Sequence, residues 1–417
     1  MTSMDMSTLP PLRKDARVIA WVLASSLSRV GDVAWFIGLA WTAVHVAGPA
    51  GAGLVMGIGS VPRAAILLLG GALADRLNPR RTMVVANLAR IAVLLAAILV
   101  VETRASSLVL LLLVAAVFGL VDGMYDPASG TMPRQLVRPD DLAAVSSMFQ
   151  LGSRTATLVG APLGGVLVAT GGLASVMAFD AISFAVIAVV LALLLKPRFP
   201  LERSRGRSVR SDLADGFRYL RRAPSARTLT IAVSGLNLFV GPVTAVGLVL
   251  RTKAEGWGAA NLGIFEACIG AAAAVGAVIA MRWRPRAPAR TGLLILAGQA
   301  AACAGVGFSP YAGVVGCMLV IGLTAGLASA FLSGAFQRTI EPAYLGRTGS
   351  MVMLSDQALM PLAMTGFGAL AGLTSIVTAC TLVGAGFAAL VLWSAFRPHL
   401  DVTPDVGDPA LSTVNAS

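Results

Sequence analysis

The chain has 417 residues, of which 57% are hydrophobic and 12% are charged, and its mean hydropathy is +0.82. A soluble core of ordinary proportions cannot bury that much apolar surface, so most of it must face lipid. The four cysteines lie in apolar segments without metal-ligand spacing, and the two histidines are isolated. We therefore expect no metal and no cofactor.

Runs of about 20 mostly apolar residues, the length that a helix needs to cross a bilayer, recur along the chain. Stretches such as Leu108 to Leu120 are apolar without alternation, which favours helices over the strands of a β-barrel. The sequence predicts an all-α integral membrane protein with twelve transmembrane helices. They are expected at 17–45, 52–74, 82–101, 106–126, 142–170, 173–195, 227–250, 259–281, 291–309, 311–335, 348–372 and 374–396.

The formal net charge is +12, and most of the 32 Lys and Arg residues fall in alternate loops between these helices. That asymmetry is typical of the cytoplasmic side of membrane proteins. It predicts a multi-pass protein of the cell inner membrane with both termini in the cytoplasm. The basic charge is explained by topology, so no nucleic-acid partner is expected.

A polar stretch separates the predicted helices into two sets of six. Val117 to Gly123 (VFGLVDG) is repeated as Val320 to Gly326 (VIGLTAG), which indicates a parallel repeat. We expect an N-terminal six-helix bundle at 1–195 and a C-terminal six-helix bundle at 227–396. A disordered cytoplasmic tail is expected at 397–417.

The linker at 196–226 contains a predicted amphipathic helix. Leu213, Phe217 and Leu220 recur at helical spacing, Arg218, Arg221 and Arg222 oppose them, and Pro224 ends the pattern. Such a helix lies on the cytoplasmic lipid surface or belongs to a solvated linker, and both alternatives stay open.

Ionisable residues within a bilayer cost about 2.5 to 3.5 kcal/mol each on insertion scales, so each needs a partner or a function. Asp32 lies midway along the first predicted helix and Arg154 midway along the fifth. We expect Arg154 to pair with Asp32, with Arg29 as a competitor. The pair is either a permanent structural ion pair or a site where proton and substrate compete.

Other charged residues also fall within predicted helices. Arg90 and Asp122 are expected to form a structural ion pair, because both lie near adjacent cytoplasmic helix ends. Glu266 is a second candidate for protonation or for contact with a cationic substrate, and the alternative is a neutral acid bonded to a backbone carbonyl. Further candidates within or at the ends of predicted helices are Asp180, Arg63, Gln337, Asp356 and Gln357.

Two motifs carry a resemblance to a known family. GGALADRLNPRRTM follows the second predicted helix and is similar to a loop motif of the major facilitator superfamily. GAPLGG in the fifth is similar to the antiporter motif of its drug-exporter branch, which includes macrolide efflux proteins and the enterobactin exporter. The loop residues concerned are Gly71, Asp75, Arg76, Arg80 and Arg81, and those of the fifth helix are Gly160, Pro162, Gly164 and Gly165.

The resemblance implies the major facilitator fold, with two six-helix pseudo-repeat bundles that rock about a central site. It also implies that the loop is a cytoplasmic gating latch stabilising the outward-open state, and that the fifth-helix motif packs the two halves together near the extracellular side. The alternatives are that the arginines only set topology and that the glycines only pack helices.

Together these features predict a secondary active transporter, specifically a proton-coupled exporter (antiporter) of a small amphipathic molecule such as a drug, natural product or siderophore. The expected partners are that substrate, protons and the lipid bilayer, and we expect a monomer. An importer or facilitator of the same fold and a non-transporting membrane scaffold are the alternatives. The sequence has no H-E-x-x-H, G-x-S-x-G or P-loop motif, so it is not expected to be an enzyme.

Overall fold

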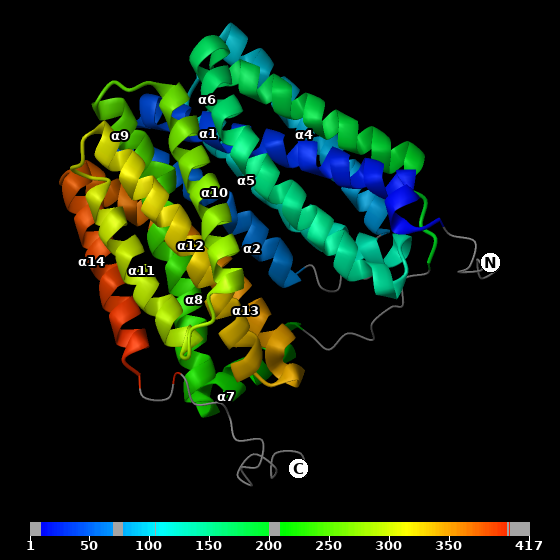
Figure 1. Ribbon diagram of the computed structural model, residues 1–417. Coiled ribbons are helices and arrows are strands. Elements are labelled where there is room, and N and C mark those ends of the chain that lie inside the picture. Colours follow the sequence, from blue (N-terminus) through cyan, green and yellow to red (C-terminus); the bar gives the residue numbers. More distant parts are fainter. Residues whose placement is uncertain (1–9, 70–77, 105, 200–208, 398–399, 401–417) are drawn as a thin grey trace.

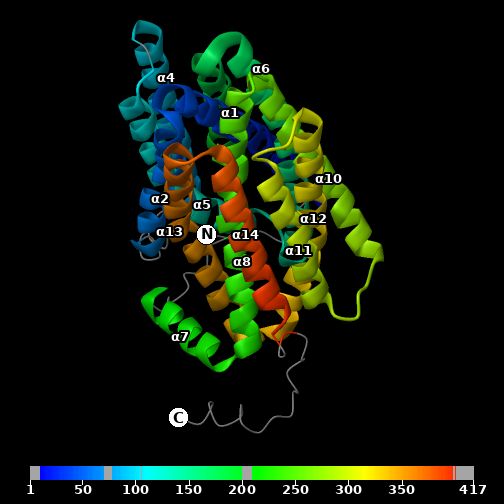
Figure 2. The ribbon, with the colours of Figure 1, turned by 90° about the vertical axis from the view of Figure 1, so that its left-hand side faces the viewer.

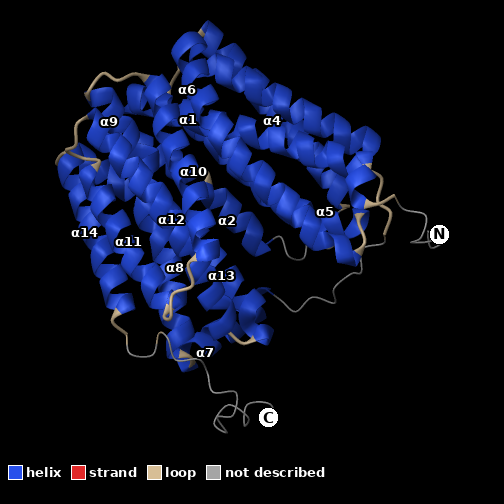
Figure 3. Ribbon diagram, in the orientation of Figure 1, coloured by secondary structure: helices blue, strands red, loops and turns tan. Residues whose placement is uncertain are grey.

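The computed structural model describes residues 10–69, 78–104, 106–199, 209–397 and 400. All regular elements in these ranges are helices (Figure 3). Eight helical stretches among them are long and apolar enough to cross a membrane. The predicted all-α membrane fold is confirmed.

In the first half, two helical stretches are each long enough for two membrane spans: α1 continued by α2, and α6. Gly48 and Gly172 interrupt α1 and α6 with φ of 64° and 63°, a backbone conformation that glycine adopts without steric cost. Beyond the second break, the Ser175 hydroxyl donates to the carbonyl oxygen of Leu167 at 2.7 Å. The described elements of this half are η2 (Leu12–Lys14), α1 (Ala16–Ile58), α2 (Ser60–Leu69), α4 (Pro79–Thr103), α5 (Leu108–Leu136), η3 (Pro139–Asp141), α6 (Leu142–Val189) and the π-helix η4 (Val190–Leu194).

The second half begins after α7 (Val209–Arg222). Several of its helices start at a proline, which is favourable there because the first helical position needs no N–H donor. Its elements are α8 (Pro224–Pro242), the π-helix η5 (Val243–Gly247), α9 (Leu248–Ala254), α10 (Ala259–Arg282), α11 (Pro288–Gly305), α12 (Tyr311–Thr339), α13 (Pro342–Leu373) and α14 (Ile376–Ala395). The first three form one continuous stretch from Pro224 to Ala254.

The described helices make the twelve expected passes when both spans of α1–α2 and of α6 are counted, although some ends differ from the prediction. The fourth predicted helix ended at residue 126, whereas α5 continues through Pro127 and Pro133 to Leu136. Met132 and Leu136 are fully buried, and this packing offsets the backbone hydrogen bonds lost at the prolines. Core packing therefore overrides a local helix-ending signal here.

The amphipathic helix α7 packs on the second half, as Figure 2 shows below α13 and α8. Leu220 is buried, and the ring of Tyr219 stacks on that of Tyr344 with centroids 4.4 Å apart. The Tyr219 hydroxyl accepts a hydrogen bond from the backbone N–H of Glu341 at 3.2 Å. Phe217 from the predicted apolar face is 59% exposed. Part of that face is therefore covered by protein, which neither predicted alternative anticipated.

The two halves pack backbone to backbone near the turns at Gly48 and Gly172, which we call the turn end. A Cβ atom added to Gly263 of α10 would lie 2.4 Å from Cα of Pro162 in α6. One added to Gly53 in the second span of α1 would lie 2.4 Å from the carbonyl oxygen of Met364 in α13. Away from the turn end, the ribbons of the two halves diverge (Figure 1).

A valine at Gly263 should separate the halves at the turn end, because its side chain has no room against α6. We expect Gly263→Val to cost about 1 to 3 kcal/mol of unfolding free energy, the usual cost of overpacking. It should also increase labelling of single cysteines placed at the α6–α10 contact. Gly316→Val in α12 is the control, since nothing lies within 4 Å of a Cβ atom there. Equal effects of both variants would contradict a tight contact at Gly263.

An ion pair joins Arg198, which follows η4, to Asp15, which precedes α1. Both guanidinium Nη atoms of Arg198 donate to the carboxylate of Asp15, and Nη1 also donates to the carbonyl oxygen of Leu136 at 3.2 Å. Burial opposes ionisation of Asp15. The hydrogen bonds and charge of Arg198, with backbone N–H donors, nevertheless hold the pKa of Asp15 below its ordinary value of 3.8.

Because the folded-state pKa of Asp15 is depressed, its contribution to stability is present above pH 3.8 and is lost as the pH falls through the folded-state pKa. We expect Asp15→Asn to reduce the unfolding free energy at pH 7 by about 1.5 to 3 kcal/mol, as for hydrogen bonds to charged groups. The difference from wild type should shrink in acid. Unfolding in detergent at pH 7 and pH 3 measures both, with Glu102→Gln, an exposed acid, as control. A difference independent of pH would disprove the charge pairing.

Candidate functional site

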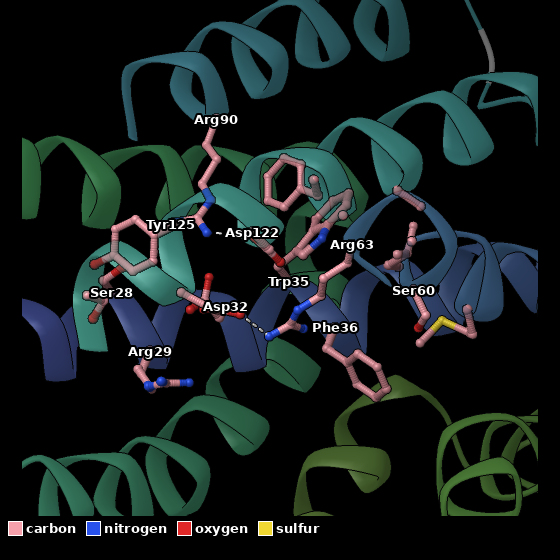
Figure 4. A pocket seen from close by; sticks show the side chains of 18 of the residues that line it. Ser28, Arg29, Asp32, Trp35, Phe36, Ser60, Arg63, Arg90, Asp122 and Tyr125 are labelled. Atoms are coloured by element: carbon pink, nitrogen blue, oxygen red, sulfur yellow. Dashed lines mark hydrogen bonds and ion pairs between the residues drawn. The ribbon is translucent and has the colours of Figure 1, made fainter. Parts of the chain in front are cut away.

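The first half encloses a cavity of about 340 Å³ between α1, α2, α4, α5 and α6. Figure 4 shows basic and acidic side chains from several of these helices pointing toward one another. Its charged lining residues are Arg29, Asp32, Arg63, Arg90, Asp122 and Asp126. Its aromatic lining residues are Trp35, Phe36, Phe118, Tyr125 and Phe149. A cavity of this size, lined by both charged groups and aromatic rings, is large enough for a small molecule.

Helical spacing brings these side chains to one place. In α5 the polar lining residues are Asp122, Tyr125, Asp126 and Ser129, which recur every three or four positions and share one face. In α1 the spacing is the same for Ser25, Ser28, Arg29, Asp32, Trp35, Phe36 and Leu39. Two polar stripes in otherwise apolar helices thus face each other across the cavity.

The guanidinium of Arg90 in α4 contacts an acid, an amide and two aromatic rings. Its Nη2 donates to Oδ1 of Asp122, and its Nη1 lies 3.4 Å from Oδ1 of Asn87. Its guanidinium carbon lies 4.5 Å from the ring centroid of Tyr125 and 4.9 Å from that of Phe184. The Arg90 side chain is only 6% exposed, so its charge is fixed beside the cavity. The pair with Asp122 is the arrangement that the sequence suggested.

Arg63 and Asp126 form a second ion pair that the sequence analysis did not assign. Arg63 Nη2 of α2 donates to Oδ2 of Asp126, and each side chain is about one-third exposed or less, 33% and 29%. The signal available in the sequence was the polar stripe of α5, on which Asp126 follows Asp122 by one helical turn. Two of the three cavity acids are therefore bonded to arginines.

Asp32 is the third cavity acid and forms no hydrogen bond or ion pair within the described ranges. The basic groups whose charges act on it are Arg90 and Arg29, and the acidic ones are Asp122 and Asp126. Arg90 is already bonded to Asp122. Asp32 therefore faces the cavity as an acid without a base of its own.

The predicted pairing of Arg154 with Asp32 is wrong. Arg154 is exposed, does not line the cavity and is not among the charges acting on Asp32. The face of α6 toward α1 is formed instead by Gly152 and Gly160: a Cβ atom on Gly160 would lie 2.7 Å from the carbonyl oxygen of Val30. Residue 154 is two positions from Gly152, so its side chain projects from another side of the helix. The sequence predicted the position of Arg154 along the helix, but not the side of the helix from which its side chain projects.

Glu266 lies in α10 of the second half and outside the cavity lining. Its side chain is half-buried, and no hydrogen bond or ion pair joins it to another described residue. The structure does not bring it together with Asp32. The described residues also contain no group of three or more His, Cys, Asp or Glu side chains that is able to hold a metal ion.

A family model described as the Major Facilitator Superfamily matches residues 21–364, most of the chain and both halves of the fold. The chain belongs to this superfamily. It is 26% identical over 404 residues to the "Uncharacterized MFS-type transporter YfiS" of Bacillus subtilis (strain 168), covering 91% of this chain and 94% of that protein.

Solved structures of the superfamily fold also match. A bacterial homologue of the iron transporter ferroportin, solved in an inward-facing state, has a TM-score of 0.72 at 15% identity, with 93% of this chain and 100% of that chain covered. The peptide transporter POT in complex with sulfate gives 0.71 at 14% identity, with coverages of 96% and 99%. At these identities the likeness establishes the fold alone.

The superfamily-like motif in α6 has two packing partners. Gly160 and Gly164 pack on α1, since a Cβ atom on Gly164 would lie 2.7 Å from Cα of Ala34. Pro162 and Gly165 instead meet α10 of the other half, where a Cβ atom on Gly165 would lie 2.8 Å from the carbonyl oxygen of Ala259. The motif therefore contacts both the cavity helix α1 and the opposite half.

The superfamily-like loop is described only in part. Gly71, Asp75 and Arg76 lie outside the described residues. Arg80 donates through Nε to the carbonyl oxygen of Leu191 at 2.8 Å and through Nη2 to that of Ala192. It thereby satisfies carbonyls at the end of the sixth span, where η4 leaves them without helical partners. Arg81 is exposed.

Replacing Arg90 tests whether the cavity charges are paired as described. Arg90→Met should cost about 1.5 to 3 kcal/mol of unfolding free energy, because it leaves the partly buried Asp122 carboxylate without its charged hydrogen-bond partner. Adding Asp122→Asn should restore much of the loss. Arg154→Met is the control and should change stability by less than about 0.5 kcal/mol. The measurement is the unfolding free energy of each variant in detergent. Additive losses in the double variant would show that Arg90 and Asp122 do not interact.

Proposed function

We propose that this superfamily member is a proton-coupled exporter that moves a small amphipathic molecule, such as a drug, natural product or siderophore, by alternating access. The observation that carries the proposal is Asp32, the one acid of the cavity lining without a bonded base, since Asp122 and Asp126 are each bonded to an arginine. A carboxylate of this kind is able to bind either a proton or a cationic group of a substrate. Exchange of the two at one site couples their movements.

The chemistry of the cavity supports an amphipathic substrate. Trp35, Phe36 and Phe118 offer apolar surface, while Ser28, Ser60 and Tyr125 offer hydroxyl groups. The bonded arginines Arg63 and Arg90 are neutralised by their partners, so they attract a free anion less strongly than unpaired bases do. A molecule with an apolar body and a basic or hydroxylated part suits this lining.

The packing of the two halves supports alternating access. With both termini in the cytoplasm, as the distribution of basic residues favours, the turn end faces outward and is closed by the α6–α10 and α1–α13 contacts. This is the state in which a cytoplasmic substrate enters. Asp75 and Arg76 with Arg80 then form the gating latch of the opposite, outward-open state, and the contacts of Pro162 and Gly165 with α10 are close contacts that must part during the cycle.

Within this proposal the protein works as a monomer in the inner membrane, with the substrate, protons and lipid as its partners and no nucleic acid. Arg29, one turn from Asp32, and Glu266 in the second half are further candidates for substrate or proton contact. An importer or facilitator uses the same fold, and only the direction of transport and its dependence on a proton gradient separate them.

A panel of labelled compounds in proteoliposomes, with and without an imposed pH gradient, identifies the substrate and tests coupling. Uphill transport of at least one compound should require the gradient. Asp32→Asn should abolish that gradient-driven component, because an amide does not exchange protons. Asp140→Asn, the same change at an exposed acid, should leave it intact. Undiminished uphill transport by Asp32→Asn would exclude Asp32 as the coupling residue, and accumulation without a gradient would exclude proton coupling.

A further inference from the structure

The sixth span contains a fully buried acid that does not line the cavity. Asp180 of α6 is 0% exposed and is not part of the cavity lining. The first span of α1 passes directly over it at Gly31, where an added Cβ atom would lie 2.3 Å from Asp180 Oδ1 and 2.4 Å from Ser183 Oγ. Gly31 is therefore required for the carboxyl group to fit. The next residue along α1 is Asp32.

The carboxyl group of Asp180 has few hydrogen bonds. The Ser183 hydroxyl lies 3.2 Å from Oδ1, but it also donates to the backbone carbonyl oxygen of Asp180 at 2.8 Å. The other carboxyl oxygen, Oδ2, is buried and has no hydrogen-bond partner. A buried carboxylate supported by one shared hydroxyl is unfavourable, whereas the neutral acid is tolerated.

The charged groups around Asp180 do not supply a free base. The charged residues whose electrostatic effect reaches Asp180 are Asp32 of α1, Arg90 of α4 and Asp122 of α5. Arg90 is bonded to Asp122 and is therefore not a free base. The remaining neighbour is Asp32, an acid, and two nearby carboxylates resist being ionised together.

We propose that Asp180 holds a proton on the far side of α1 from the cavity and forms with Asp32 an electrostatically coupled pair, in which the two carboxyl groups are not ionised together. A negative charge on Asp32 opposes ionisation of Asp180, and protonation of Asp32 removes that opposition. A proton arriving at Asp32 from the cavity is thus sensed at a site that substrate does not touch. The use of this pair in transport rests on the proposed function, but its existence does not.

Infrared difference spectroscopy of the purified protein in detergent tests the pair, because the C=O stretch of a protonated carboxyl group is distinct from the bands of a carboxylate. At neutral pH, wild type should show a protonated-carboxyl band that Asp180→Asn lacks and that Asp140→Asn, a change at an exposed acid, retains. In Asp32→Asn the band should remain at neutral pH. The pH at which it disappears on alkaline titration should fall by about one unit or more, because the charge of Asp32 no longer opposes ionisation.

Two results would overturn the proposal. An Asp180→Asn spectrum without loss of a protonated-carboxyl band means that Asp180 is ionised. An unchanged titration in Asp32→Asn means that the two acids are not coupled. If Asp180→Asn does not fold, Ser183→Ala replaces it: removal of the hydroxyl should shift the band, and an unshifted band rejects the assignment to Asp180. Because no substrate is used, a failure of proton-driven export leaves the spectroscopic result standing.

Discussion

The structure of the first half depends on one constraint: charges inside a bilayer must be compensated, since water is not there to solvate them. Two arginine–aspartate pairs meet this requirement, Arg90 with Asp122 and Arg63 with Asp126, and both join α5 to a neighbouring helix. Arg63 and Arg90 are used in this way, and Asp32 faces the cavity without a bonded partner among the described residues. The same constraint favours a neutral carboxyl group at Asp180. Pairing thus determines which acids remain available to exchange protons.

Small residues set the distances at which this charge arrangement is possible. Gly31 lets α1 lie against Asp180, and Gly160 and Gly164 let α6 lie against α1, so the backbone itself forms the wall between the cavity and the buried acid. Gly53 and Gly263 bring the two halves equally close at the turn end. The contact between the halves at the turn end combines these close glycine approaches with buried apolar side chains from both halves.

The fold was predictable from the sequence because hydropathy and length alone specify membrane-crossing helices, and the repeat of VFGLVDG as VIGLTAG paired the halves. The site was predictable only in part. Depth along a helix follows from sequence position, which was sufficient for Asp32 and for Arg90 beside Asp122. Direction depends on helix rotation, which hydropathy does not define, and so Arg154 was paired wrongly. Asp180 was only a weak candidate in the sequence, because its burial depends on Gly31, a residue on another span.

The central claim is that Asp32 exchanges a proton for substrate within the first-half cavity. Its most direct test is the proton release that accompanies binding of a transported compound to the purified protein in weakly buffered detergent solution, followed with a pH-sensitive dye. Wild type, loaded with protons at mildly acidic pH, should release protons as the compound binds, and Asp32→Asn should bind without comparable release. Equal release by both proteins, or binding to wild type with no release at any pH, would contradict the account.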